Sequence, residues 1–549
     1  MLCIEFNNKV IKSKIQDKSE KQMVKTLDCT LRDGGYINDW DFGKENIHKI
    51  IDNLSQANID LIECGFFEDC EHSKDKSFFS DLNQVNQYIS PDAKSDYAVM
   101  TRLGKLKIDN IPIYKGSGVS GIKVTFHINE INEAMDYCKQ VKSKGYKLFI
   151  QPVGTTSYTD IQLIELIHLV NEISPFAFYI VDTLGVMVKK DIDRLFYLVD
   201  HNLNQDISIG FHSHNNLQMS FSNAQELVSL NSERIIYVDS SVAGMGRGAG
   251  NLNTELICQY LNMSQDGKYH IEYVLTIIDE YINKIQPKSL WGYSIPYYLA
   301  AVYNTHPDYA SFLINKQTLD VNSIAKILFS LPMDSKEMFD FELIQKAYFQ
   351  YQTHQIDDSL AKQKILEYVG NKEVLILAPG KTVEKHEKDI IEIIKNKKPV
   401  IISVNFKPDN ISPDFIFFSN LRRYNQFYDK EFDNNTDIKY ILSSNVIQNE
   451  TDNTLIVNYS DLVNDFVYIK DNATLMLLKL LSLTSCKNIL VGGFDGYDYD
   501  EKNNYYNDKM ETSLGKNEYI LLNKQITSFL NKYMDQKMLK FVTPTKYGV

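Results

Sequence analysis

The segment ISIGFHSHNN, residues 207–216, decides how we expect this chain to fold. A mostly apolar run ends abruptly in two histidines and two asparagines. This is typical of a buried strand that delivers polar groups to one edge of a sheet. Side chains two residues apart on a strand point to the same face, so the imidazoles of His212 and His214 can reach one point. The segment therefore predicts a strand whose carboxyl end carries a ligand site.

Seven further runs are similar, and helical stretches separate them. Residues 128–145 and 161–173, for example, carry apolar side chains at helical spacing. Eight strand–helix units in roughly 270 residues favour a (β/α)8 barrel, although counting alone leaves a doubly wound open sheet as the alternative. The eight predicted strands are residues 24–31, 60–66, 97–101, 121–126, 147–153, 178–183, 207–214 and 234–241.

The chain continues well beyond this barrel, which we place at residues 24–290 after an N-terminal segment, residues 1–23. Residues 291–370 are rich in aromatic side chains and lack strand-like runs, so we expect helices packed against the barrel and then a linker. Strand-like runs return in residues 371–549, beginning with VLILAPGK. The predicted fold class is therefore α/β: a TIM barrel with a helical extension, followed by a Rossmann-like domain.

The composition is that of an ordinary globular protein. The chain has 549 residues, of which 44% are hydrophobic, and 58 Lys+Arg against 71 Asp+Glu give a net charge of -13. This balance argues against non-specific binding to nucleic acid. No apolar run approaches the about 20 residues of a membrane span. The seven cysteines form no CxxC pair, and the first residues lack a signal-peptide pattern, so we expect a reducing, cytoplasmic location.

Polar residues at the predicted strand ends point to a metal site, because the active site of a (β/α)8 barrel forms there. Asp33 ends the first strand, and closure of the barrel brings it near the two histidines. One carboxylate and two imidazoles suit a divalent metal. Arg32 can stabilise an oxyanion beside it, and Asn251, after the glycine-rich segment 244–250, can add an oxygen ligand. The alternatives are surface histidines in a polar loop and a simple Arg32–Asp33 ion pair.

TLRDGG, HSHNN and VDSSVAGMGRGAGNLNTE resemble motifs of the DRE-TIM metallolyases, above all the pyruvate aldolase branch that includes 4-hydroxy-2-oxovalerate aldolase. The resemblance covers residues 24–350. It implies Mn²⁺ or Mg²⁺, in some members Co²⁺ or Zn²⁺, held by Asp33, His212 and His214 with Asn251 as a fourth ligand. It also implies that Arg32 stabilises the enolate of the substrate.

Two departures from this family concern proton transfer. The aldolase branch has a histidine three residues after the metal-binding aspartate, where this chain has Tyr36. The lyase branch has a cysteine in the glycine loop, and residues 244–250 contain none. The candidate replacements are Tyr36, a metal-bound water, Tyr293, His306 and His127. Of these, His127 directly follows the fourth strand and titrates near neutral pH, with an ordinary loop histidine as the alternative.

Three more polar residues are expected near the metal. Glu63 ends the second strand and is a candidate catalytic residue. Asp182 and Thr183 end the sixth strand and are expected to support the metal ligands.

The reaction that the resemblance implies is reversible aldol cleavage or condensation between the enolate of pyruvate, or a related 2-oxo acid, and an aldehyde. The second domain suggests a sugar-derived aldehyde, as in surface-polysaccharide synthesis. Two alternatives stay open: a Claisen-type acyl-CoA synthase or lyase on the same barrel, and a binding protein that lost catalysis with the missing histidine. We expect a homo-oligomer.

The second domain carries its own candidate site. VLILAPGKTVEKH and the segment from ATLMLL to NNYYND resemble parts of bacterial sialyltransferase-like proteins. Those enzymes use a histidine in the C-terminal half, whereas the last histidine here is His386, so a working transferase is not expected. Gly380, Lys381 and Thr382 can receive a phosphate at a helix N-terminus, and Asp495 a sugar hydroxyl. We therefore expect a nucleotide or nucleotide-sugar, with a structural or docking domain as the alternative.

Overall fold

The computed structural model describes most of the chain from residue 23 onward. The segments outside the described residues are 1–22, 91–93, 265–267, 287–290, 337, 428–437, 447–452, 500–503, 508–509, 511–515, 536–537 and 548–549. The N-terminal segment expected at residues 1–23 therefore lies outside the described residues, except for Met23.

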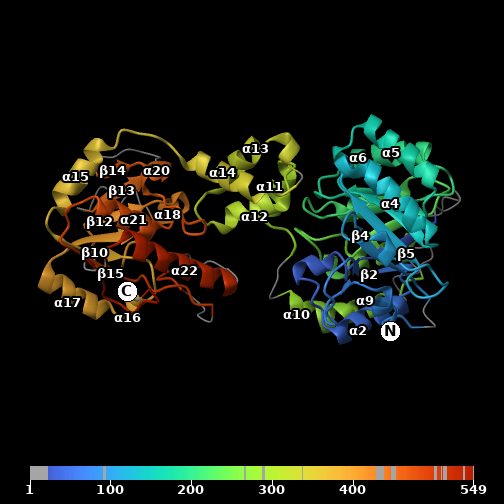
Figure 1. The fold of residues 1–549 in the computed structure, drawn as a ribbon, viewed down its shortest axis with the longest axis horizontal. Helices are drawn as coiled ribbons and strands as arrows, with labels where there is room; N and C mark the ends of the chain where they lie inside the picture. Colours follow the sequence, from blue (N-terminus) through green and yellow to red (C-terminus); the bar gives the residue numbers. More distant parts are fainter. Residues whose placement is uncertain are drawn as a thin grey trace. The chain divides into compact units, whose positions relative to one another are not determined.

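The N-terminal part is a closed parallel barrel (Figure 1). Its strands are ordered β1-β9-β8-β7-β6-β5-β4-β2, and pairing of β1 with β2 closes the ring; the two-residue β3 (Phe78–Phe79) extends β2. All eight strands predicted from the sequence are confirmed. They are β1 (Val24–Asp28), β2 (Leu61–Phe67), β4 (Asp96–Arg102), β5 (Gly121–Phe126), β6 (Lys147–Pro152), β7 (Ala177–Asp182), β8 (Ser208–Ser213) and β9 (Ile236–Ser240).

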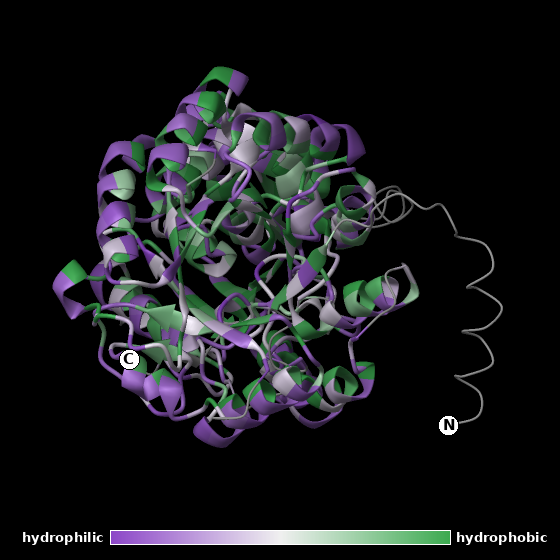
Figure 2. Ribbon diagram, turned by 90° about the vertical axis from the view of Figure 1, so that its right-hand side faces the viewer, coloured by the Kyte–Doolittle hydropathy of each residue, from purple (hydrophilic) through white to green (hydrophobic). Residues whose placement is uncertain are grey.

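Helices cover the outside of this barrel. In α2, for example, Ile47, Ile50, Ile51 and Leu54 are buried at helical spacing, while the residues between them face water. Figure 2 shows the same alternation of hydrophilic and hydrophobic residues around the turns of the outer helices. The helices are α2 (Lys44–Gln56), α3 (Leu82–Asn86), α4 (Ile131–Ser143), α5 (Asp160–Ile173), α6 (Lys189–Asn202), α7 (Ser220–Ser229), α8 (Thr254–Ser264), α9 (Ile271–Ile277), α10 (Asn283–Ile285) and α11 (Ile295–Val302).

The C-terminal part is a second α/β unit, as predicted, and its parallel sheet has seven strands in the described residues. The strand order is β14-β13-β12-β11-β10-β15-β16. The strands are β10 (Glu373–Leu377), β11 (Val400–Val404), β12 (Phe415–Phe418), β13 (Lys439–Ser443), β14 (Thr454–Val457), β15 (Asn488–Gly492) and β16 (Leu539–Phe541). The helices are α13 (Val321–Ser330), α14 (Phe341–Gln352), α15 (Ser359–Val369), α16 (Thr382–Lys385), α17 (Glu387–Lys397), α18 (Leu421–Phe427), α20 (Tyr459–Leu462), α21 (Ala473–Ser482) and α22 (Lys516–Tyr533).

The boundary between the two units differs from the expectation. We expected residues 291–370 to pack against the barrel, but the chain divides inside α12 (Pro307–Asn315), after Ala310; only residues 336–339 return to the barrel unit. The C-terminal unit holds α14 through hydrogen bonds, such as that from Gln352 Nε2 to Tyr459 Oη at 3.0 Å. It holds α15 because Ile365 is buried in the core of its sheet.

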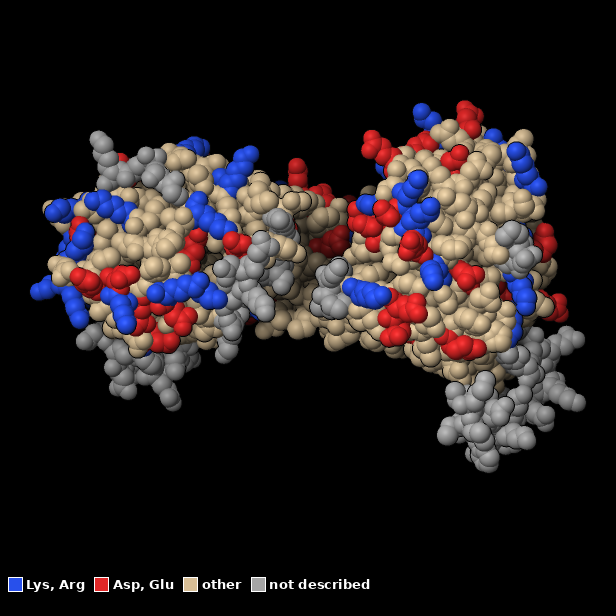
Figure 3. Space-filling model, turned by 90° about the horizontal axis from the view of Figure 1, so that it is seen from below, with Lys and Arg blue, Asp and Glu red and all other residues tan. Residues whose placement is uncertain are grey.

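The described helices include none that is both long and apolar enough to cross a membrane. On the face shown in Figure 3, basic and acidic side chains are intermixed on each unit.

Candidate metal centre

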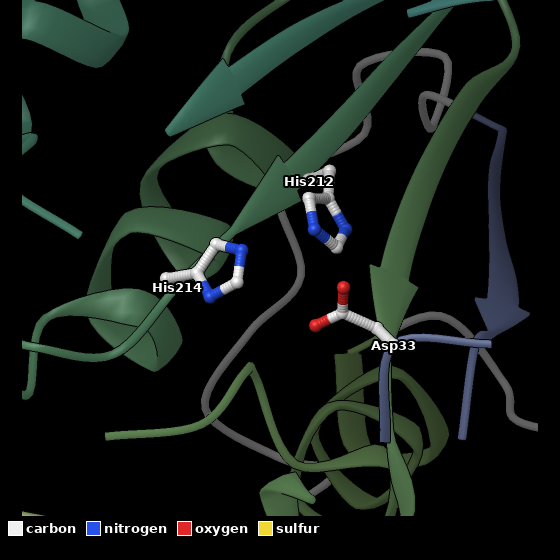
Figure 4. Close-up of side chains that lie close together, drawn as sticks. All are labelled: Asp33, His212 and His214. Carbon is white, nitrogen blue, oxygen red and sulfur yellow. The ribbon is translucent and has the colours of Figure 1, made fainter. Parts of the chain in front are cut away.

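Three side chains converge at the carboxyl end of the barrel (Figure 4). Asp33 follows β1, His212 lies on β8, and His214 lies directly after β8. Each offers one ligand atom, and these atoms all lie within 4.8 Å of one another. The two imidazole rings are 5.2 Å apart between centroids and nearly perpendicular, so both can point a nitrogen at one ion. One carboxylate and two imidazoles suit a divalent transition metal, with positions left for substrate.

Asn251 completes this group of donors. Its backbone pairs with that of His214 in an isolated bridge, and its Nδ2 donates to Asp33 Oδ2 at 2.6 Å. Its Oδ1 is buried and, within the described part of the chain, has no hydrogen-bond partner. A buried acceptor without a donor is costly, and a cation would satisfy it. The fit of a metal is therefore supported by an atom that the protein itself leaves unsatisfied.

Gly246 keeps this space open. A Cβ at this position would lie 2.4 Å from Asn251 Nδ2, too close for any side chain, and 3.0 Å from Asp33 Oδ2, a tight contact. The glycine-rich loop thus serves the site by close approach of its backbone.

The charges of the site favour metal binding. Burial opposes ionisation of Asp33, but the charge of Arg32 and then those of His214 and His212 outweigh it and hold its pKa well below the usual range. Desolvation lowers the pKa of His214 to about 4, against the opposing charge of Asp33. The aspartate is therefore ionised and His214 neutral near pH 7, which are the forms that bind a cation.

Two buried residues that we did not predict stand behind His212. Its Nδ1 lies 3.2 Å from Asp239 Oδ2, and the same oxygen accepts a hydrogen bond from Lys123 Nζ at 2.6 Å. Both of these charged side chains are fully buried, and Lys123 also lies 4.3 Å from the centre of the Tyr179 ring. Asp239 can fix the ring so that Nε2 faces the ligand group. The available signal was a lysine inside the apolar strand run GIKVTF.

Arg32 is buried beside the ligands, as predicted. It donates to Asp33 Oδ1, and its Nε donates to Glu63 Oε2 at 3.0 Å. Glu63 also lies 3.8 Å from Lys123 Nζ. Arg32 Nη2 is buried and has no partner among the residues that the structure describes. Glu63 therefore holds the guanidinium in place, and one N–H group of Arg32 stays available for a ligand.

The candidate acid–base residues differ in their surroundings. The pKa of Tyr36 is raised by desolvation and then by the charge of Asp33, and the Arg247 guanidinium lies 5.5 Å from the centre of its ring. His306 is buried, and this desolvation, followed by the charge of Arg247, lowers its pKa to about 4. The charge of Asp308 opposes this shift, and His306 Nδ1 lies 3.7 Å from Asp308 Oδ2. Tyr293 is largely exposed.

Asp182 and Thr183 brace loops. The carboxylate of Asp182 accepts the backbone N–H groups of Val186 and Met187 at 2.9 and 3.0 Å, and burial raises its pKa to about 7. Its backbone carbonyl accepts from the N–H of His214 at 3.2 Å. Thr183 Oγ1 accepts from the N–H of Gly154 at 2.9 Å. Both side chains therefore shape the loops around the ligands.

The turn expected to bind a phosphate is held by the protein itself. The N–H of Thr382 donates to Asp495 Oδ2 at 2.9 Å, the Thr382 hydroxyl donates to Oδ1, and the N–H of Gly380 donates to Gly493 O at 2.8 Å. Lys381 precedes the four-residue helix α16. The carboxylate of Asp495 thus stands where we expected an anion.

The barrel is similar in sequence to known proteins. Curated relatives include an oxaloacetate decarboxylase from Mycobacterium tuberculosis, 24% identical over 42% of this chain and 68% of the relative. A 4-hydroxy-2-oxovalerate aldolase from Pseudoalteromonas translucida is 27% identical over 43% of this chain and 68% of the relative. Another, from Geobacillus genomosp. 3, is 25% identical over 44% of this chain and 71% of the relative. The solved N-terminal domain of a proposed aldolase from Bacteroides vulgatus is 25% identical, with TM-score 0.47, over 55% of this chain and 99% of that one.

A protein-family model also matches the barrel. The HMGL-like family model covers residues 23–282, which include every metal-ligand candidate and Arg32. This match covers a little under half of the chain, and residues 23–282 are therefore similar to the HMGL-like family.

Proposed function

We propose that the barrel is a divalent-metal-dependent carbon–carbon lyase of the aldolase type, acting on pyruvate or a related 2-oxo acid. The observation that carries the proposal is the convergence of Asp33, His212 and His214 beside the buried Arg32. The names of the curated relatives support it, because they are aldolases and a decarboxylase of 2-oxo acids. Mn²⁺ and Mg²⁺ are the proposed metals, with Asn251 Oδ1 as a further ligand.

The metal ligands, Arg32 and Glu63 have different roles in the proposed reaction. A divalent ion held by these ligands supplies Lewis-acid polarisation of the keto and carboxylate oxygens of a 2-oxo acid. Arg32 directs its remaining N–H group to the oxygen on which negative charge develops. Glu63 fixes the guanidinium through Nε, so little reorganisation is needed when the charge forms. Buried walls around Arg32 and Glu63 exclude water and strengthen this interaction.

Aldol cleavage also needs a base. A group must take the hydroxyl proton of a 4-hydroxy-2-oxo acid as the carbon–carbon bond breaks and the aldehyde leaves, and a proton must then reach the enolate carbon. We assign this transfer to His127 and His306. Burial lowers the pKa of His306 to about 4, so this imidazole is neutral near pH 7 but a weak base, and His127, which directly follows β5, is the first candidate for the base. Tyr36 then acts as a hydroxyl donor to the substrate.

A second candidate, decarboxylation of a 2-oxo diacid, is favoured by Tyr36. Loss of CO₂ produces the same enolate without removal of a hydroxyl proton, so it needs no base where the aldolase branch has its histidine. The relative named oxaloacetate decarboxylase supports this candidate.

The test is exchange of the pyruvate methyl protons for solvent deuterium, followed by NMR with Mn²⁺, with Mg²⁺ and after chelation. We expect exchange that requires the metal and is abolished in Asp33→Asn. Comparing the cleavage of 4-hydroxy-2-oxovalerate with the decarboxylation of oxaloacetate then separates the two reactions. If the metal-loaded protein exchanged no protons and acted on neither substrate, the proposal would be wrong.

A further inference from the structure

A cavity of about 420 Å³ lies inside the C-terminal unit. It opens where β10, β11, β12 and β15 end, and residues that follow these strands line it: Gly380, Asn405, Ser419 and Phe494. The chain runs from β10 outward to β14 and then returns to β15 on the other side of β10. Open parallel sheets bind ligands at the carboxyl ends of the strands at such a switch point. The volume is within the about 300–1,000 Å³ of small-molecule sites.

Two buried polar groups in this lining are unsatisfied. Asn405 Oδ1 and Ser419 Oγ have no hydrogen-bond partner in the described part of the chain, although the two residues are only 6% and 4% exposed. Asn405 also has a left-handed backbone, with φ of 59°, which costs free energy for a residue with a side chain. Strain and unsatisfied polar atoms at one place are typical of a site that binds a polar ligand.

The N-terminus of a helix also lines this cavity. Asn472, Ala473 and Thr474 line it: Asn472 is the N-cap of the ten-residue helix α21, whose first residues are Ala473 and Thr474. The side chain of Asn472 accepts from the N–H of Leu475 at 3.2 Å, so the amides of Ala473 and Thr474 are the ones that face this end of the helix. The first amides of a helix lack intrahelical acceptors, and the helix dipole is positive there. The guanidinium of Arg423, which is 4% exposed, lines the cavity as well; its Nη1 donates to Gln426 Oε1 and its Nη2 to Met510 O, each at 2.8 Å. These two features are the ones in the lining that favour an anionic group such as a phosphate.

Three carboxylates also line the cavity: Asp471, Asp495 and Glu518. Asp471 accepts a hydrogen bond from Tyr348 and Asp495 accepts two from Thr382, so these two charges are already partly compensated within the protein.

Aromatic side chains supply the rest of the wall. Phe312, Phe341, Tyr497, Tyr505 and Tyr547 present flat apolar surface to the cavity. A ligand that fits all these features has a phosphate, several hydrogen-bonding groups and a ring that packs on aromatic faces.

We propose that this cavity binds a nucleotide, with its phosphate at the N-terminus of α21 and at Arg423. Asn405 and Ser419 hydrogen-bond to its ribose or base, and the aromatic wall packs on its base. The site lies beside the turn at Gly380–Thr382 that the sequence indicated, but the groups that bind the anion are different ones.

The experiment is calorimetric titration of the full-length protein with CMP, UMP, AMP and GMP, with the corresponding diphosphates, and with glucose 1-phosphate and inorganic phosphate. We expect at least one nucleotide to bind and inorganic phosphate to bind much more weakly. Ser419→Ala removes a hydroxyl without a described protein partner, so it should leave the thermal unfolding unchanged and weaken nucleotide binding about 3–10-fold. Asn405→Asp keeps the shape of the side chain and should weaken nucleotide binding roughly tenfold.

Ser482→Ala is the matched control, because its hydroxyl bonds to Lys479 O at the exposed end of α21 and should not affect binding. The proposal is overturned if no nucleotide binds. Equal affinity for inorganic phosphate, or nucleotide binding unchanged in both Ser419→Ala and Asn405→Asp, would also overturn it. Stronger binding of glucose 1-phosphate than of every nucleotide would replace the nucleotide with a sugar phosphate.

Discussion

The buried pair of Lys123 and Asp239 gives the sharpest test of how the barrel holds its metal ligands. Lys123→Met keeps most of the side-chain volume but leaves Asp239 ionised, with its main partner removed. Nζ and Oδ2 are 2.6 Å apart, and neither side chain is exposed. Breaking a buried ion pair costs about 3–5 kcal/mol of unfolding free energy. Loss of a residue that orients a ligand also lowers metal affinity roughly 10–100-fold.

Tryptophan fluorescence measures this effect in the barrel alone. The chain has two tryptophans, Trp40 and Trp291, and both belong to the barrel unit. Urea unfolding followed by their emission therefore reports the stability of this unit.

Lys147→Met is the matched control. Lys147 Nζ lies 2.7 Å from Asp96 Oδ2, a similar distance, but the two side chains are 35% and 44% exposed. An exposed pair contributes about 0–1 kcal/mol. If Lys123→Met lost no more stability than Lys147→Met and bound metal normally, the role of the buried pair would be refuted. The double variant Lys123→Met/Asp239→Asn should regain part of the lost stability, because it leaves no uncompensated charge.

Three further predictions concern the same unit. Arg32→Lys keeps the charge but loses the planar donor group, so the rate of pyruvate proton exchange should fall roughly 10²–10³-fold, and near-normal exchange would indicate a structural ion pair only. Gly246→Ala places a methyl group against Asn251 and should weaken Mn²⁺ binding measurably, while unchanged binding would contradict the close approach described above. Burial raises the pKa of Asp28 from its ordinary 3.8 to about 6, so the folded state holds this proton and loses stability as pH rises from about 4 to 6. Asp28→Asn should therefore gain stability relative to the natural protein across that window, by up to about 3 kcal/mol at 1.36 kcal/mol per pKa unit, and an equal difference at pH 4 and pH 8 would refute it.

The barrel strands and the ligand residues could be predicted from the sequence because both depend on local patterns. Strand β5 was predicted with its exact bounds, since its apolar run is framed by polar residues. The ligands were found because they stand at strand ends, and closure of the barrel brings β1 and β9 together, with β8 next to β9. Their roles in binding and catalysis stay predictions.

Other features depend on contacts that a single sequence does not reveal. The pairing of Lys123 with Asp239 joins positions 116 residues apart, and neither strand indicates which charge the other faces. Helix α14 is amphipathic, but its sequence does not say which unit buries it. Strand β16 was missed because its three residues, LKF, are too short to give a pattern. The turn at Gly380 was predicted to bind an anion because the sequence does not show that the fold brings the carboxylate of Asp495 to Thr382.

Titration of the full-length protein with Mn²⁺, followed by electron paramagnetic resonance of the free ion, tests the central claim most directly. We predict one Mn²⁺ per chain at the barrel site, and a change in the relaxation of water protons when pyruvate is added, because the 2-oxo acid displaces water from the ion. Loss of a residue that only supports a ligand lowers metal affinity roughly 10–100-fold. His212→Ala removes a ligand itself, so it should lower the affinity for Mn²⁺ by more than that. Binding as tight in His212→Ala as in the natural protein, or a bound ion indifferent to pyruvate, would contradict the account.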